Sequence, residues 1–181
     1  YTHGFNPQPR VQFGPPLSVG YESEHELIDV YMAGHADLRE TLKRVNEQAP
    51  YGIFFSGAQE VELKAPSLGA AALEAEYLAV LPQACASEEV ETCVARFRNG
   101  VSFEVEIERK KGAVKKDLKK CIHISGIEKT AAGNSAIRLT GSLSSEDYVN
   151  PITALAHILG LADGQSEQIC MTRMAIRLKK S

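Results

Sequence analysis

The side chains best suited to do chemistry lie in a stiff loop near the start of the sequence. Residues 4–10 (GFNPQPR) interleave polar side chains with two prolines. Proline fixes its own φ angle, so we expect the loop to hold Asn6, Gln8 and Arg10 in defined directions and to lose little entropy on binding. The guanidinium of Arg10 can bind a phosphate through two parallel hydrogen bonds. The alternative, a rigid structural loop in which Arg10 pairs with an internal carboxylate, stays open.

A second candidate is the basic run at residues 109–120 (RKKGAVKKDLKK), which holds seven basic residues and a single acid, Asp117. Such a run can face the phosphates of a nucleic acid. It can also be a solvated strand–turn–strand edge on which lysines prevent further pairing. Only alternate residues of a strand face one side, so about half of the run could meet one ligand. The candidate RNA-binding residues here are Arg109, Lys110, Lys111, Lys115, Lys116 and Lys119.

The histidines and cysteines predict no metal site and no cofactor. The five histidines and four cysteines are scattered, without a C-x-x-C pair and without a histidine at ligand spacing from a cysteine. Scattered cysteines in a chain of this length are typical of reduced thiols, and therefore of a cytoplasmic protein. No glycine-rich phosphate loop, nucleophile elbow or H-E-x-x-H motif occurs, so catalytic residues stay unknown.

The composition predicts a globular chain of one large or two small domains. Hydrophobic residues make up 44% of the 181 residues, and no run of 18 apolar residues exists that would span a membrane. Membrane partners are therefore not expected. The chain opens at Tyr1 directly into a loop rich in glycine and proline, from which we expect that residues upstream of Tyr1 are missing.

The first half of the chain, residues 1–63, predicts a strand–strand–helix–strand order. Strands are expected at Val11–Phe13, Leu27–Met32 and Ile53–Leu63. Asp37 begins the helix as its cap, and Leu38, Leu42 and Val45 form its apolar face. Residues 64–73, which are mostly small, are predicted to be a connector.

The second half, residues 74–181, predicts a strand–helix–strand–strand–helix–strand order with a long or split third strand. The expected elements are strands at 74–81, 101–107, 121–127, 136–143 and 169–178, with helices after Ser87 and after Asn150-Pro151. The strict alternation at Val101, Phe103, Val105 and Ile107 predicts a strand of the main sheet whose apolar face meets the helices. This order is ferredoxin-like. The predicted fold is therefore α+β with two ferredoxin-like halves, of which the first lacks its opening strand and helix.

Residues 4–30 (GFNPQPRVQFGPPLSVGYESEHELIDV) resemble the start of a bacterial family known as the radical-SAM-linked domain of unknown function. Members carry a Gly-Phe-Asn-Pro-His-Pro-(Arg/Lys) loop, then a run with proline and leucine, then a strand ending in Leu-Asp. Residues 64–68 (KAPSL), Asp117 and residues 149–151 (VNP) also resemble family features. Gln8 stands where the family usually has histidine. Members begin with a strand and a basic helix, which agrees with a missing upstream segment.

The resemblance implies a function through the proteins that are encoded next to family members. Members are encoded beside, or fused to, a radical-SAM protein, sometimes near a ribonuclease of the E/G type. We therefore expect an accessory protein without catalytic activity of its own that binds RNA or a radical-SAM partner. The alternatives are an RNA-modifying or RNA-processing enzyme that uses the Asn6–Arg10 loop, and a structural module for protein–protein interaction. A positive cleft would favour RNA, and a large exposed apolar patch would favour a protein partner.

Overall fold

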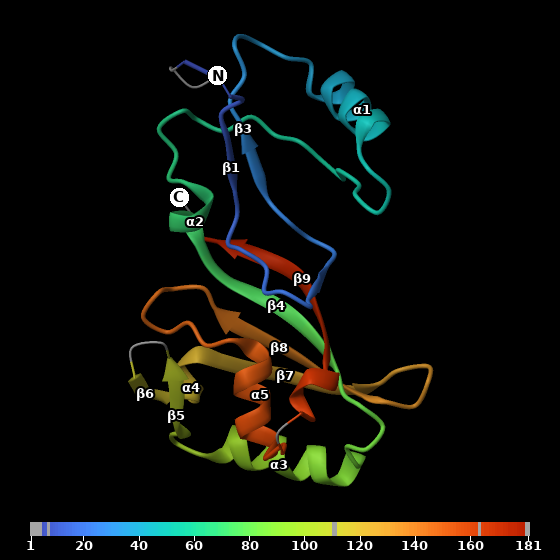
Figure 1. The fold of residues 1–181 in the computed structure, drawn as a ribbon, viewed down its shortest axis with the longest axis vertical. Helices are drawn as coiled ribbons and strands as arrows, with labels where there is room; N and C mark the ends of the chain where they lie inside the picture. Colours follow the sequence, from blue (N-terminus) through green and yellow to red (C-terminus); the bar gives the residue numbers. More distant parts are fainter. Residues whose placement is uncertain (1–4, 7, 110–111, 163, 180–181) are drawn as a thin grey trace.

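The computed structural model describes residues 5–6, 8–109, 112–162 and 164–179. Within these ranges the protein is a mixed α/β structure with five α-helices and three sheets. Figure 1 shows an elongated molecule, with the main sheet and helices α3 and α5 at one end and strands β1 and β3 with helix α1 at the other. No helix in the described ranges is long and apolar enough to cross a membrane.

The main sheet has five strands in the order β2-β9-β4-β8-β7. Its neighbours are antiparallel, except that β2 runs parallel to β9. The strands are β2 (Glu22–Ser23), β4 (Ala72–Val80), β7 (Ile122–Lys129), β8 (Ser135–Ser142) and β9 (Cys170–Leu178). The first half of the chain thus contributes an edge strand to a sheet that is otherwise built from the second half.

The core lies between this sheet and helices α3 (Ser87–Asn99) and α5 (Pro151–Leu159). Both helices bury one apolar face, and β4 and β8 supply alternate buried residues beneath them. The Asn150 side chain accepts hydrogen bonds from the N–H groups of Ile152 and Thr153, at 2.9 and 3.3 Å, as its N-cap position predicts. Gly160 ends α5 in the left-handed region at φ 65°, which glycine adopts without strain.

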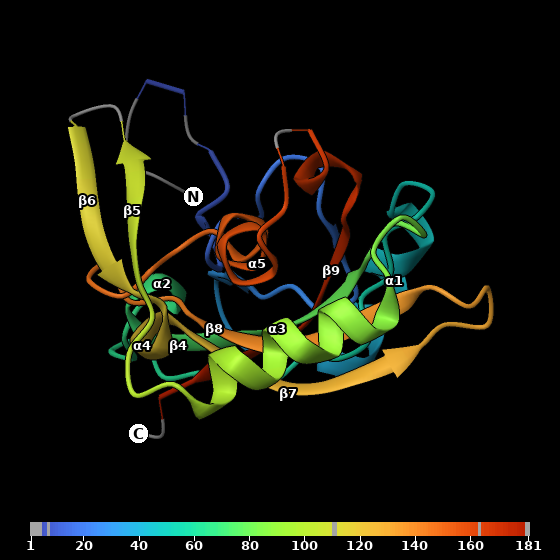
Figure 2. The same ribbon diagram turned by 90° about the horizontal axis from the view of Figure 1, so that it is seen from below.

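The prediction for the alternating segment at 101–107 is wrong in one respect. The segment forms β5 (Glu104–Arg109), which pairs with β6 (Gly112–Asp117) in a two-stranded ribbon outside the main sheet. Val101 is 99% exposed, whereas Phe103, Val105 and Ile107 are partly buried against the core. Figure 2 shows the ribbon projecting beside α4 (Leu118–Cys121). Alternation of apolar and polar residues predicts which face of a strand is apolar, but it does not predict which strand it pairs with. Here the partner is β6, the next strand along the chain.

The first half is built around a small hairpin and one helix. Strand β1 (Val11–Phe13) pairs antiparallel with β3 (Ile28–Val30). Asp37 caps α1 (Leu38–Gln48) by accepting hydrogen bonds from two backbone N–H groups at 2.9 and 3.0 Å, so the predicted helix start is confirmed. Up to Ser67, no residue that the structure describes is buried.

The predicted strand at Ile53–Leu63 is absent, and this prediction is wrong. The segment is irregular and pairs with no strand. Its apolar side chains are exposed, with Phe54 at 78% and Leu63 at 87%. A strand needs a neighbour for its backbone groups, and sequence pattern alone does not supply one. The connector at 64–73 contains a short helix, α2 (Leu68–Ala71), that leads directly into β4.

A buried arginine joins the two halves. The Arg173 side chain on β9 is 1% exposed, and its Nη2 donates to both carboxylate oxygens of Glu26, at 2.6 and 2.7 Å. The same nitrogen donates to the backbone oxygen of Pro15 at 3.0 Å. A buried guanidinium without these acceptors would be strongly unfavourable. The segment after β1 is therefore held against the main sheet by charge.

A second link joins the halves at the start of α5. The Tyr21 hydroxyl donates to Asn150 Oδ1 at 2.8 Å and accepts from the Ile152 N–H at 3.2 Å. The Asn150 amide in turn donates to the Ser18 hydroxyl at 3.3 Å. Burial raises the pKa of the Tyr21 hydroxyl well above its usual value, so it stays a neutral donor. The cap of α5 is thus shared with the first half of the chain.

We expect Glu26→Gln to lower the free energy of unfolding by about 2–3 kcal/mol, because it leaves the buried Arg173 charge uncompensated. Glu26 is 46% exposed, so the loss should fall below that of a fully buried pair. Urea denaturation of the full chain measures it. Glu24→Gln, which removes the same charge from an exposed neighbour, is the control. Equal losses in both variants would contradict the role of the pair.

Candidate functional site

The loop of Asn6, Gln8 and Arg10 is exposed. The Arg10 guanidinium lies over the Tyr31 ring, with 4.0 Å between its central carbon and the ring centroid. The Tyr31 N–H also donates to the Arg10 backbone oxygen at 3.0 Å. Arg10 therefore stacks on an aromatic ring rather than pairing with an internal carboxylate, and stacking leaves its edge nitrogens accessible. Pro7 lies outside the described residues.

The basic run does not form one continuous face. Lys115 is exposed and stands opposite Glu106 in the ribbon. The Lys116 ammonium donates to the Glu146 backbone oxygen. The Lys119 ammonium donates to the last carbonyls of α3, those of Phe97 at 3.1 Å and Arg98 at 3.0 Å. Lys116 and Lys119 thus hold the ribbon and α4 in place. Arg109 ends β5, and Lys110 and Lys111 lie outside the described residues.

The loop and the basic run lie at different ends of the molecule. Arg10 directly precedes β1 near α1, whereas β5 and β6 flank α4 at the opposite end (Figure 1). A single positive cleft that joins them is therefore absent from the described structure. The predicted RNA-binding residues remain a hypothesis, but any RNA would have to contact two separate places.

Asp117 organises the end of the basic run. Its Oδ1 accepts hydrogen bonds from the backbone N–H groups of Phe103 at 2.9 Å and Lys119 at 3.1 Å. The first bond joins the start of the ribbon to its end, and the second caps α4. The Phe103 N–H, followed by the Lys119 N–H and the nearby lysines, holds the pKa of Asp117 below its usual value. This aspartate is structural.

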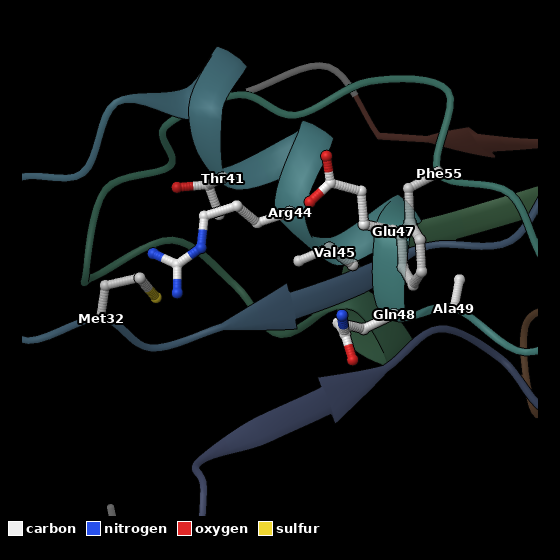
Figure 3. A pocket seen from close by; sticks show the side chains of 8 residues that line it. All are labelled: Met32, Thr41, Arg44, Val45, Glu47, Gln48, Ala49 and Phe55. Atoms are coloured by element: carbon white, nitrogen blue, oxygen red, sulfur yellow. The ribbon is translucent and has the colours of Figure 1, made fainter.

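A hollow runs along α1 and is lined by Met32, Thr41, Arg44, Val45, Glu47, Gln48, Ala49 and Phe55. Figure 3 shows these side chains, with Arg44 reaching from α1 toward Met32 and Phe55 standing by Ala49. The groove has a volume of about 630 Å³ and is open to solvent. We call it the α1 groove.

The far wall of the α1 groove depends on one side chain. Asn46 on α1 donates to the Phe55 backbone oxygen at 2.9 Å and accepts from the Phe55 N–H at 2.8 Å. His35 and Glu60 form a second tie at 3.1 Å, exposed to solvent. The irregular segment after α1 is thereby fixed opposite the helix, where a paired strand would otherwise be needed.

The α1 groove combines apolar walls with one unpaired cation. Met32, Val45, Ala49 and Phe55 supply the apolar walls. Arg44 is exposed and has no hydrogen-bond or ion-pair partner within the ranges that the structure describes. Methionine and phenylalanine suit an apolar segment of another chain, and a free arginine suits an acidic residue on it. The groove can bind; it brings together no nucleophile and base.

Sequence reasoning missed this groove. The sequence predicted an apolar face on α1 but no groove beside it, and Val45 in that face is 39% exposed. The available signal was the apolar face of this helix in a half of the chain with few other elements to cover it. No three histidine, cysteine or acidic side chains gather at metal-binding distance in the described ranges, and the absence of a metal site stays a prediction.

Comparison with known proteins identifies a family but no activity. A family model described as "Uncharacterized protein conserved in bacteria (DUF2344)" matches residues 1–151. Its description does not mention radical-SAM proteins. No curated protein and no solved structure matches the chain.

We expect Asp117→Ala to lower the free energy of unfolding by about 1–2 kcal/mol at pH 7, as a lost cap does. The folded pKa lies below the unfolded value of 3.8, so the carboxylate stabilises the fold above that pH. The gap between wild type and Asp117→Ala should therefore shrink as the pH falls below about 4. Urea denaturation at several pH values measures both effects.

Asp117→Asn is the matched control, since asparagine caps helices about as well as aspartate. It should keep most of the stability at pH 7 and lose the pH dependence. A gap between wild type and Asp117→Ala that stays constant into acid would show that the charge is irrelevant.

Proposed function

Since the chain belongs to this family of uncharacterised bacterial proteins, we propose its function from the geometry: it is an accessory protein that binds a partner protein in the α1 groove. The observation that carries the proposal is the distribution of exposed apolar side chains. Most of the large exposed apolar residues lie before Ser67, where no described residue is buried. Met32 and Val45 of this set line the α1 groove, and exposed apolar side chains that gather at one place are typical of a protein-binding site.

The chemistry of the groove favours an amphipathic segment as its occupant. Apolar side chains of the segment would cover Met32, Val45 and Phe55, and an acidic side chain would pair with Arg44. Burial of the aromatic and aliphatic walls would supply most of the affinity, and the charge pair would set the orientation.

The proposed partner is a radical-SAM protein of the same bacterium. This rests on the resemblance of residues 4–30 to a radical-SAM-linked family, and the family model itself adds nothing on partners. A protein partner is favoured over RNA because Lys116 and Lys119 are used inside the fold and Arg10 is remote from the ribbon. Among the residues that the structure describes, no acid–base group converges on the Asn6–Arg10 loop to support the enzyme alternative.

We also propose that residues 74–181 form a ferredoxin-like unit with an inserted ribbon. Support comes from the order β9-β4-β8-β7 with antiparallel neighbours, joined in the chain order β4, α3, β7, β8, α5, β9. The inserted elements are β5, β6 and α4. The first half has a hairpin and one helix, and the ferredoxin-like origin of that half is not needed for the binding proposal.

We expect Arg44→Glu to weaken binding of the partner at least about tenfold, because it replaces an attractive pair by a repulsive one. The measurement is calorimetric titration of the purified full chain with the radical-SAM protein. Arg39→Glu is the matched control, since Arg39 is exposed on the same helix but does not line the groove. Equal weakening by both variants would mean that only the overall charge of the protein matters. It would contradict binding of the partner in the α1 groove.

The RNA alternative has its own measurement. If three or four phosphates were contacted, single-stranded RNA binding should fall with salt at a log–log slope of about −2 to −3. Lys115→Glu together with Lys116→Glu should then weaken it for all sequences about equally. Binding of this kind, without a complex with the protein partner, would replace our proposal. Self-association that Arg44→Glu abolishes would instead make a second copy the occupant.

A further inference from the structure

A separate cluster of polar side chains lies at the opposite end of the molecule from the α1 groove. It brings together Lys129 at the end of β7, Ser87 at the start of α3 and Ser135 at the start of β8. The two hydroxyl oxygens are 3.0 Å apart. The Lys129 ammonium donates to the Ser87 hydroxyl, and to the Ser135 hydroxyl at 3.2 Å. Residues 42 positions apart in sequence thus share one hydrogen-bonded triangle.

The fold fixes the triangle through backbone pairing. Lys129 and Ser135 stand opposite each other in the β7–β8 register, at the mouth of a short turn. The Leu81 N–H donates to the Ser135 backbone oxygen at 2.9 Å, which places the chain leading into α3 beside β8. Ser135 itself is 3% exposed. The cluster is therefore built on three regular elements rather than on a loose loop.

The hydrogen-bond donors in the triangle outnumber its internal bonds. A lysine ammonium carries three N–H donors and each serine hydroxyl carries one, so five donors are available and the three bonds use three of them. Two donors remain, and no carboxylate lies within ion-pairing distance of Lys129 in the described ranges. An ammonium and a hydroxyl with spare donors suit an anionic oxygen ligand.

A small hollow opens onto these donors. It has a volume of about 210 Å³ and is lined by Gln83, Cys85, Ala86, Ser87, Lys129, Ala132, Gly133, Asn134 and Ser135. The Asn134 Oδ1 atom in its wall is buried and has no hydrogen-bond partner within the described ranges. A buried acceptor without a donor is unfavourable, so a turn of the Asn134 side chain that brings Oδ1 to a donor on a ligand would relieve this cost. A protonated phosphate oxygen or an ester alcohol carries such a donor.

Carboxylates near the hollow repel an anion and therefore lower the affinity that we expect for it. Glu88 and Glu89 lie in the first turn of α3, next to Ser87. Burial, and then the Glu89 carboxylate, raises the pKa of the Cys85 thiol above its usual value, so Glu89 reaches the hollow electrostatically. An anion bound here should therefore be held weakly and by direct hydrogen bonds. Removal of the Glu89 charge should strengthen its binding.

We propose that the hollow beside Ser87, Lys129 and Ser135 binds the phosphoryl group of a small phosphate monoester. Lys129 and one serine hydroxyl donate to the phosphoryl oxygens, and Asn134 Oδ1, after its side chain turns toward the hollow, accepts from the protonated oxygen or from a hydroxyl of the ester. The site is distinct from the α1 groove and needs no partner protein. It binds, and no covalent step is assigned to it.

The test is calorimetric titration of the full chain with inorganic phosphate and with phenyl phosphate, at constant ionic strength. We expect saturable binding with a dissociation constant of about 1 mM or below. Lys129→Met should weaken it at least about tenfold, and Ser135→Ala severalfold. Lys115→Met, which removes an exposed lysine from the ribbon, should leave it unchanged. Glu89→Gln should strengthen it.

Three results would overturn the proposal or its phosphoryl assignment. No saturable heat from wild type with either probe at about 10 mM overturns the proposal. Equal weakening by Lys129→Met and Lys115→Met also overturns it, because it reduces binding to net charge. Acetate that competes as well as phosphate would overturn the phosphoryl assignment. If circular dichroism shows that Lys129→Met does not fold, Ser87→Ala with the Glu89→Gln comparison decides, since neither changes the core.

Discussion

The guanidinium of Arg173 is the constraint on which the arrangement of the two halves depends. It sits on the second strand of the main sheet at 1% exposure, where a charge is tolerated only with a full set of acceptors. Those acceptors are Glu26 and the Pro15 carbonyl, both far away in sequence. The second half therefore cannot bury this strand without the first half. The Tyr21–Asn150 hydrogen bond likewise ties the first half of the chain to the second half, at the start of α5.

The local elements could be predicted from the sequence, and their partners could not. Asp37 and Asn150 were predicted as caps because a short polar side chain before a periodic apolar run satisfies free N–H groups within its own helix. The apolar face predicted for the alternating segment 101–107 is confirmed at Phe103, Val105 and Ile107 but not at Val101, and whether the strand joins the main sheet or forms a separate ribbon depends on which sheet edge is free. The strand predicted at 53–63 failed for the same reason.

The three candidate sites differ in how visible they are in the sequence. A run of lysines is conspicuous, yet two of the described lysines in it are used to fasten backbone carbonyls. The triangle of Ser87, Lys129 and Ser135 leaves no motif, because strand register brings its members together. The α1 groove left only an indirect sign, an apolar helix face without enough chain to cover it. Short-range sequence pattern thus pointed only to the basic run, whose binding role stays a prediction, and did not reveal the triangle or the groove.

The bidentate tie between Asn46 and Phe55 has a thermodynamic consequence for anything that occupies the α1 groove. This amide pair and the exposed His35–Glu60 tie hold a segment that has no buried residue, so we expect the wall to open locally at a small cost in free energy. Only the closed state is competent to bind. The apparent affinity of an occupant is its intrinsic affinity multiplied by the closed fraction, and an occupant that contacts Phe55 raises that fraction as it binds. Substitution of Asn46 should therefore change how far the groove is preorganised for its occupant.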